Sequence, residues 1–125
     1  MWYEYLMNNE FVKQLYNRVP ELRDLEIEDF NVSYYGQSIK ISFDMPKWID
    51  VVPKKWELKK CNSIMMELEF WDINDLTFTL GKSKKNDIDI NILEDNKMKI
   101  IMKGGINAEF IADAGIIQKI EGYVR

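Results

Sequence analysis

The sequence contains no histidine and only one cysteine, Cys61. Without histidine, the commonest general base and metal ligand is missing, and so is every catalytic triad built on imidazole. One thiol cannot form an internal disulfide, a redox pair or a cysteine-based zinc site. We therefore expect a protein that is not an enzyme, that holds no metal or cofactor, and that works in a reducing compartment.

Long apolar runs are also missing, and no stretch is long enough to span a bilayer. Residues 1–5 offer neither the basic start nor the apolar run of a signal peptide. The formal net charge is −4, from 17 basic and 21 acidic residues, so the chain lacks the positive field that a nucleic-acid binder needs. These absences predict a cytoplasmic protein that binds neither membranes nor nucleic acids, and its charge suits a basic protein partner.

What the sequence does contain predicts one domain over residues 1–125, since 125 residues with 46% apolar side chains can bury a single core. Residues 9–19 are expected to form a short amphipathic helix, because Phe11, Leu15 and Val19 recur at helical spacing. Asn8 or Asn9 can cap its start, and Pro20 ends it.

From residue 24 onward, apolar and polar residues alternate with the period of a β-strand. A change of parity near residues 28–29 predicts a β-bulge. Gly36-Gln37 predicts a two-residue type II′ hairpin turn. That turn would place three apolar pairs opposite each other: Tyr34 with Ile39, Val32 with Ile41, and Phe30 with Phe43.

Further alternating segments follow within residues 64–70, 76–80, 88–92, 98–102, 106–110 and 116–124. Between them lie short polar connections, including Asp72–Asp75 and the Gly104-Gly105 turn. We predict a mainly β (α+β) fold: a curled antiparallel β-meander sheet or sandwich of about seven or eight strands with one N-terminal helix. Sandwich and half-open barrel both fit this pattern. Residues 46–62 show no period and are expected to form a long connection, with Trp56 pinning it to the core.

Paired carboxylates are the main candidates for chemistry. Asp87 and Asp89 alternate with apolar residues, and Lys103 and Lys99 are their expected cross-strand ion-pair partners. Turn chemistry explains Asp72, Asn74 and Asp75 better than a cation site does, because the glycine and closing glutamate of an EF-hand loop are missing. Gly81-Lys82-Ser83 lacks the upstream glycine of a phosphate loop, so that interpretation is rejected.

A protein-binding surface is predicted on the strand that carries Glu67 and Glu69. Met65 and Trp71 share the face of these acids, and aromatic residues and methionine are enriched at interfaces. Glu26 and Glu28 add a second acidic pair. The competing interpretation is that a helix or the 46–62 segment covers this face and buries Trp71.

Several short motifs together resemble the immunity protein 50 family of bacterial polymorphic toxin systems. They cover most of the chain, and the most specific is Pro53-Lys54-Lys55-Trp56 followed by Asn62 and an amphipathic strand that closes at Phe70. The remaining motifs are these: residues 19–24 after a helix, the Tyr34–Phe43 hairpin, Asp72–Leu76, residues 110–112 and residues 120–123.

The resemblance implies a non-enzymatic immunity protein that binds and neutralises a cognate toxin domain inside the producing cell. Such toxins are often nucleases with basic sites, which an acidic inhibitor can occupy. Two other functions stay open at this point. One is a small apolar-ligand-binding β-domain, with Trp48, Trp56 and methionines lining a cavity. The other, ranked lower, is a carboxylate enzyme using Glu67/Glu69 or Asp72/Asp75.

Overall fold

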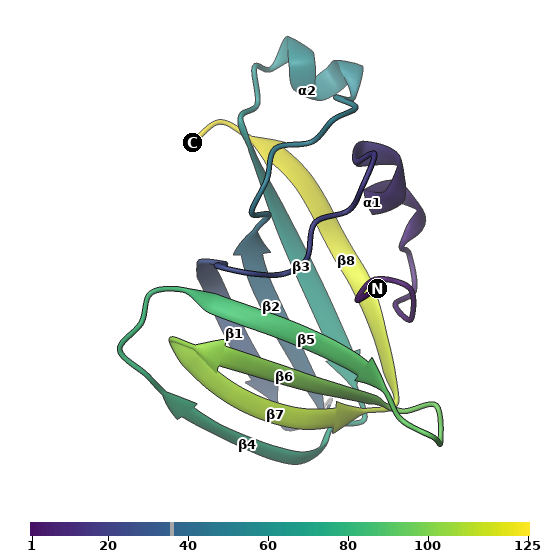
Figure 1. The fold of residues 1–125 in the computed structure, drawn as a ribbon, viewed down its shortest axis with the longest axis vertical. Coiled ribbons are helices and arrows are strands. Elements are labelled where there is room, and N and C mark those ends of the chain that lie inside the picture. Colours follow the sequence, from purple (N-terminus) through teal and green to yellow (C-terminus); the bar gives the residue numbers. More distant parts are fainter. Residues whose placement is uncertain (36) are drawn as a thin grey trace.

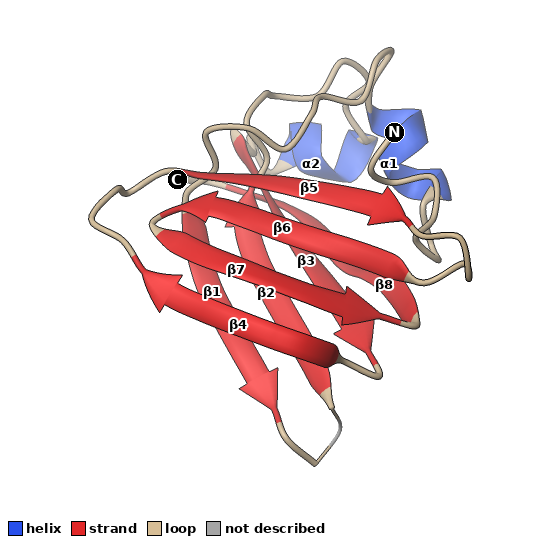
Figure 2. Ribbon diagram, turned by 60° about the horizontal axis from the view of Figure 1, so that its bottom comes forward, coloured by secondary structure: helices blue, strands red, loops and turns tan. Residues whose placement is uncertain are grey.

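The computed structural model describes residues 1–35 and 37–125 and is built from two four-stranded antiparallel sheets and two short helices. Sheet A has the strand order β1-β2-β3-β8, and sheet B has the order β4-β7-β6-β5. The two sheets face each other with their strands crossing at a steep angle, and both helices lie at one end (Figure 1, Figure 2). In chain order the elements are α1 (Glu10–Leu15), β1 (Ile27–Ser33), β2 (Ser38–Asp44), α2 (Lys54–Leu58), β3 (Ser63–Trp71), β4 (Asn74–Leu80), β5 (Asn86–Ile92), β6 (Met98–Gly104), β7 (Ile106–Ala112) and β8 (Ala114–Tyr123).

The mainly β architecture and the strand positions confirm the expected fold class, and the structure decides between the open alternatives in favour of two facing sheets. The expected meander is only partly correct. The chain runs β1-β2-β3 and β5-β6-β7 as neighbours, but β4 pairs with β7 and β8 returns to pair with β3. The alternation in the sequence predicts Thr77 and Thr79 on the strand next to Glu67 and Glu69. This is wrong: they lie in sheet B, because the chain leaves sheet A after Trp71.

The core lies between the sheets and is built by the alternating apolar residues of both inner faces. Phe70 of β3 and Phe110 of β7 meet there edge to face, with ring centroids 5.6 Å apart. Such pairs add stability beyond the apolar area they bury. The largest fully buried side chains are Leu15, Leu22, Leu25, Ile39, Ile41, Phe43, Met66, Leu68, Phe70, Ile88, Ile100 and Phe110.

The β1–β2 hairpin has the expected bulge, between Ile27 and Asp29, but not the expected register. Val32 lies opposite Ile39 and Phe30 opposite Ile41, two residues away from the predicted pairing. The last pair is Ser33 with Ser38, so the connection is longer than a two-residue turn and Tyr34 lies outside the ladder. Gly36, half of the predicted type II′ turn, lies outside the described residues.

The N-terminal helix is shorter than predicted and ends at Leu15, because its second half is held by tertiary contacts in a non-helical conformation. Tyr16 is extended and donates its hydroxyl hydrogen bond to the carbonyl of Lys47. The backbone N–H groups of Asp50 and Val51 both donate to the carbonyl of Leu15. The predicted asparagine cap is absent, since the Asn9 side chain donates to the carbonyl of Tyr3.

The 46–62 connection contains a second short helix, α2, that the sequence did not predict. Trp56 on α2 is only 9% exposed and packs edge to face against Phe11 of α1, with ring centroids 5.8 Å apart. Its ring lies so close to Gly122 of β8 that a Cβ there would come within 2.6 Å of it. Trp56 therefore pins the connection to sheet A, as expected, and packs against protein groups rather than lining an open cavity.

Candidate functional site: the outer face of sheet A

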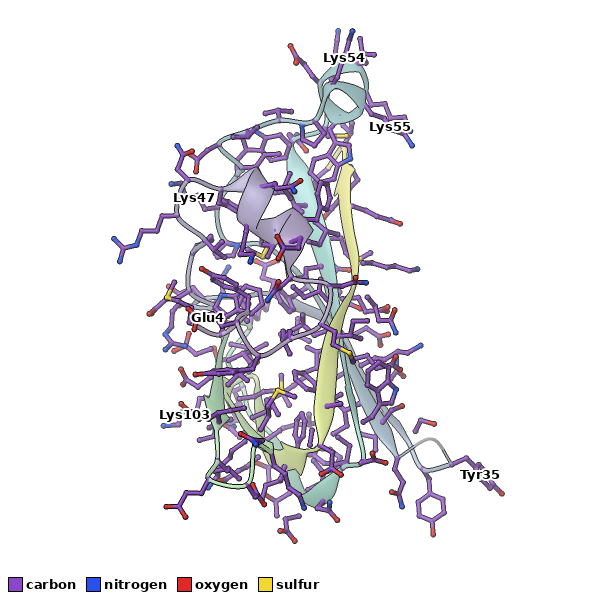
Figure 3. The ribbon with its side chains drawn as sticks, turned by 90° about the vertical axis from the view of Figure 1, so that its right-hand side faces the viewer. Glu4, Tyr35, Lys47, Lys54, Lys55 and Lys103 are labelled. Carbon is purple, nitrogen blue, oxygen red and sulfur yellow. The ribbon has the colours of Figure 1, made fainter. Side chains whose placement is uncertain are left out.

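The outer face of sheet A carries the predicted binding residues of β3 and is not covered by either helix. Sheet B, α1 and the N-terminal segment all lie on the opposite, inner side, and α2 lies beyond one end (Figure 3). This excludes the alternative in which a helix or the 46–62 segment covers the face. Met65 and Trp71 are half-buried there by their neighbours on the sheet.

Strand register identifies the other residues of this surface, because residues directly opposite each other in a ladder share a face. Glu67 lies between Ser42 of β2 and Lys119 of β8. Met65 lies between Asp44 and Glu121, and Asp29 of β1 lies opposite Ser42. The charged side chains on the face are Asp29, Lys40, Asp44, Glu67, Glu69, Lys119 and Glu121, with Arg125 after β8.

Glu69 is not the exposed carboxylate that the sequence predicted, since it is only 7% exposed. A β-bulge in β8 opposite Glu67 and Leu68 brings the Gln118 amide to the Glu69 carboxylate, with a nitrogen–oxygen distance of 2.6 Å. Lys40 from β2 lies 3.9 Å from its other oxygen. Glu69 is therefore a buried, hydrogen-bonded anchor of the face.

Three other carboxylates on this face are outside its ion pairs, although Lys119 lies across the ladder from Glu67. Asp29, Glu67 and Glu121 take part in none of the ion pairs formed within residues 1–35 and 37–125. Five carboxylates against Lys40, Lys119 and Arg125 leave the face with a net charge of −2. An uncompensated negative surface attracts positively charged partners over long range.

On the outer face of sheet B, two strand carboxylates form close ion pairs. Asp89 pairs with Arg23 at 2.6 Å, and Glu109 pairs with Lys99 at 2.7 Å. Asp87 accepts a hydrogen bond from the backbone N–H of Asp24. The predicted Asp89–Lys99 pair is wrong, because the ladder places Asp89 opposite Ile101. Asp87 does lie opposite Lys103, but the two form no ion pair in the part of the chain that the structure describes. Asp29 and Glu67 of sheet A also accept hydrogen bonds, from Asn31 and Ser42, so the two faces differ in their ion pairs and not in hydrogen bonding.

Glu26 and Glu28 lie at the rim of sheet A, near the end where Asp44 is found. Glu26 pairs with Lys85 at 3.0 Å and with Arg125 at 3.2 Å, and these hydrogen bonds hold the pKa of its carboxyl below the ordinary value. Arg125 in turn binds Asp44 at 2.8 Å. Glu26 is thus a structural ion-pair partner that ties the chain end to β1, whereas Glu28 is exposed at the bulge.

Two tyrosines have phenol pKa values raised above the ordinary one, for different reasons. Tyr123 donates to the Asp44 carboxylate at 2.5 Å, and this bond raises its pKa. Burial first, and Asp50 second, raise the pKa of Tyr16. The stability that these two protonated phenols contribute is fully present below the unfolded tyrosine pKa of about 10. It is lost as the pH rises through the higher pKa values that the two phenols have in the folded protein.

We expect an alkaline ultraviolet titration to show at least two phenols ionising above the ordinary range. Tyr123→Phe should remove one of them, because it removes the phenol that Asp44 holds protonated. An unchanged titration curve in Tyr123→Phe would contradict the Tyr123–Asp44 hydrogen bond.

The other candidate groups do not come together as a chemical site. Asp72 and Asp75 occupy the left-handed region, with φ of 56° and 54°, and Asn74 donates to the carbonyl of Asp72, so these residues shape the β3–β4 turn. Cys61 is a free, half-buried thiol. Among residues 1–35 and 37–125, no three acidic, cysteine or histidine side chains are grouped as metal ligands, and no helix is long and apolar enough to cross a membrane.

Sequence reasoning missed Asp29 and Glu121 as members of the face. Each lies on a different strand from Glu67, and only the register of β1, β2, β3 and β8 shows that the three share one surface. The alternation of apolar and polar residues in β8 indicates an outward-facing Glu121. The bulge at Gln118, however, reverses which residues of β8 face outward partway along the strand.

The fold and this face define a class: an antiparallel two-sheet β-protein with one open, negatively charged sheet surface. The family model for immunity protein 50 matches residues 8–123, nearly the whole chain. The chain belongs to the immunity protein 50 family. Searches of curated proteins and of solved structures gave no significant match.

Proposed function

We propose that this protein is a non-enzymatic immunity protein that binds and neutralises a cognate bacterial toxin domain in the cytoplasm. The surface that meets the toxin is the outer face of sheet A. The observation that supports this choice is the net charge of −2 on a sheet face left open by both helices, where Asp29, Glu67 and Glu121 form no ion pair within residues 1–35 and 37–125. Family membership supports the role itself.

The partner that fits this surface is a toxin domain with a basic site, such as a nuclease. A site that binds phosphates carries lysine and arginine side chains. Carboxylates placed across from those side chains steer the encounter and disfavour partners of like charge. Met65 and Trp71 beside the acids supply apolar contact of the kind found at interface centres.

The rest of the charge distribution is arranged to orient such an encounter. Residues 47–60 hold five lysines and two acidic residues, a local charge of +3. The remaining residues therefore hold 12 basic and 19 acidic side chains, a charge of −7. Lys54 and Lys55 lie at one extreme end of the molecule, beyond sheet A (Figure 3). A basic toxin site is repelled from that end and attracted to the acidic face.

The experiment that tests this function is co-expression with the toxin domain encoded beside this gene, scored by growth and by copurification. We expect growth rescue and a stoichiometric complex. A folded protein that neither rescues growth nor copurifies would exclude the immunity role for that toxin.

Glu67→Lys with Glu121→Lys should weaken toxin binding by about 2 kcal/mol, roughly 30-fold, mainly through a slower association rate, because like charges then face each other. The matched control is Glu57→Lys with Glu94→Lys, which makes the same charge change at exposed sites on α2 and in the β5–β6 turn. Surface plasmon resonance at low and high salt measures both. Equal affinities in the two double variants would exclude this face as the toxin site. Glu69 is left unchanged, since replacing a buried acceptor would unsettle the fold.

A further inference from the structure

Strand β4 forms one edge of sheet B, and its inward-facing side chains remain unusually exposed. Phe78 is 51% exposed although its ring touches that of Phe30, with centroids 5.9 Å apart, and Leu80 is 77% exposed. Both lie opposite inward-facing residues of β7, Ala108 and Ile106. The sandwich therefore ends at β4 before its apolar side chains are covered.

The backbone groups of β4 that point to the open edge can be identified from the pairing on its other side. Gly81 donates its N–H to the carbonyl of Gly105, in the same ladder that pairs Thr79 with Asn107. Backbone groups of successive strand residues point alternately to the two neighbouring positions. Residues 77, 79 and 81 therefore bond toward β7, and the N–H and C=O groups of Phe78 and Leu80 face the open edge.

This edge lacks the devices that normally prevent strand pairing. Native edges are protected by bulges, prolines or charged side chains, especially lysine. The edge strand of sheet A nearest to it, β1, has a bulge at Ile27–Asp29 and two acids, Glu28 and Asp29. The Leu76–Leu80 stretch of β4 has no charge and no proline, and its one irregularity lies between Asn74 and Thr77, before the regular ladder begins.

The sequence of this edge is also a palindrome, Leu-Thr-Phe-Thr-Leu, centred on Phe78. An antiparallel pair of two such strands places Phe78 opposite Phe78, Thr77 opposite Thr79 and Leu76 opposite Leu80. Aromatic and threonine cross-strand pairs are favourable, and no like charges meet.

We propose that the protein forms a twofold dimer through β4, with the two sheets B joined into one continuous eight-stranded sheet. The Phe78 backbone groups of the two copies exchange hydrogen bonds across the axis, as an antiparallel ladder requires when the twofold passes through one residue pair. Pairing covers Phe78 with Phe78 of the second copy, and Leu80 with Leu76 of the second copy. The outer face of sheet A lies on the far side of the sandwich and stays open in the dimer, so the proposal stands independently of toxin binding.

Sedimentation velocity over a wide concentration range tests the dimer directly. We expect the wild type to sediment as a dimer and Leu80→Lys to sediment as a monomer, because two lysines would be brought into the paired edge. Leu58→Lys is the matched control: it changes the same residue type at 74% exposure on α2, and it should remain dimeric. A wild type that stays monomeric at every concentration would overturn the proposal. If Leu80→Lys also lost toxin binding in that case, the β4 edge would be assigned to the toxin and not to a second copy.

Disulfide trapping tests the register. In a chain with Cys61→Ser, Phe78→Cys should give a covalent dimer on oxidation, because hydrogen-bonded residues across a ladder have Cα atoms about 5.5 Å apart, within disulfide reach. Leu80→Cys in the same background should not, since each Leu80 faces Leu76 of the other copy. Crosslinking through residue 80 but not 78, in folded variants, would overturn the Phe78-centred pairing. Circular dichroism checks folding in each case.

Discussion

Replacing Trp56 with alanine should lower the free energy of unfolding by about 3–5 kcal/mol, as expected for removing a buried aromatic side chain from a packed site. The indole ring joins three distant parts of the chain: α2, Phe11 of α1 and Gly122 of β8. A five-residue helix such as α2 has no stability of its own, so its position depends on this contact. Chemical denaturation followed by fluorescence or circular dichroism measures the loss.

Two further variants separate packing from other effects of removing Trp56. Trp56→Phe keeps an aromatic ring on Gly122 and should recover most of the lost stability. Gly122→Val should also destabilise the fold, because the new Cβ would lie 2.6 Å from the indole ring and clash with it. If Trp56→Ala unfolds at the wild-type denaturant concentration, α2 is not anchored by its tryptophan and the packing described here is wrong.

Replacing Asn86 with leucine should cost about 3 kcal/mol, because it leaves the N–H and the carbonyl of half-buried Ile106 without their partner. The Asn86 side chain is buried and forms two hydrogen bonds with the backbone of Ile106: it donates to the carbonyl at 2.8 Å and accepts from the N–H at 2.9 Å. Its own backbone pairs with Leu25, also in both directions. One residue therefore joins the start of β5, the β6–β7 turn and the segment that leads into β1.

The chain provides a matched control for this experiment in Asn107. Its exposed side chain forms the same kind of paired hydrogen bonds, donating to the carbonyl of Gly104 and accepting from the Gly104 N–H, each at 3.1 Å. Water can replace those bonds in Asn107→Leu, so the loss should be well under 1 kcal/mol. Denaturant unfolding of both variants gives the comparison. Similar losses of unfolding free energy in the Asn86 and Asn107 variants would show that burial does not strengthen the contribution of Asn86.

The strands could be predicted because alternation is a local property. Phe43, Met66 and Phe110 fall on the inner faces with the parity that the sequence shows, and the bulge near Asp29 appears as a slip in that parity. The hairpin register could not be derived in the same way. Shifting Val32 from Ile41 to Ile39 keeps every apolar residue on the same face, so the sequence pattern fits both registers equally well.

The candidate face was predicted only in its central strand. Met65, Glu67, Glu69 and Trp71 do share one surface, since side chains two residues apart point the same way. The prediction that Glu69 is exposed was wrong, because a glutamine 49 residues further along the chain reaches its carboxylate. The structural role of Glu26 likewise depends on Arg125, at the other end of the chain.

By itself the sequence determined the class of protein: the strands and their two faces, the absence of imidazole chemistry, and the resemblance that the family match confirms. The tertiary structure decided which strands are neighbours, and therefore which charges are neutralised. Asp89 pairs with Arg23 of the segment before β1, and Glu109 pairs with Lys99 across sheet B, while Glu67 and Glu121 form no ion pair within residues 1–35 and 37–125. The physical reason is that alternation is set by each strand alone, whereas charge compensation depends on partners brought together from distant parts of the chain.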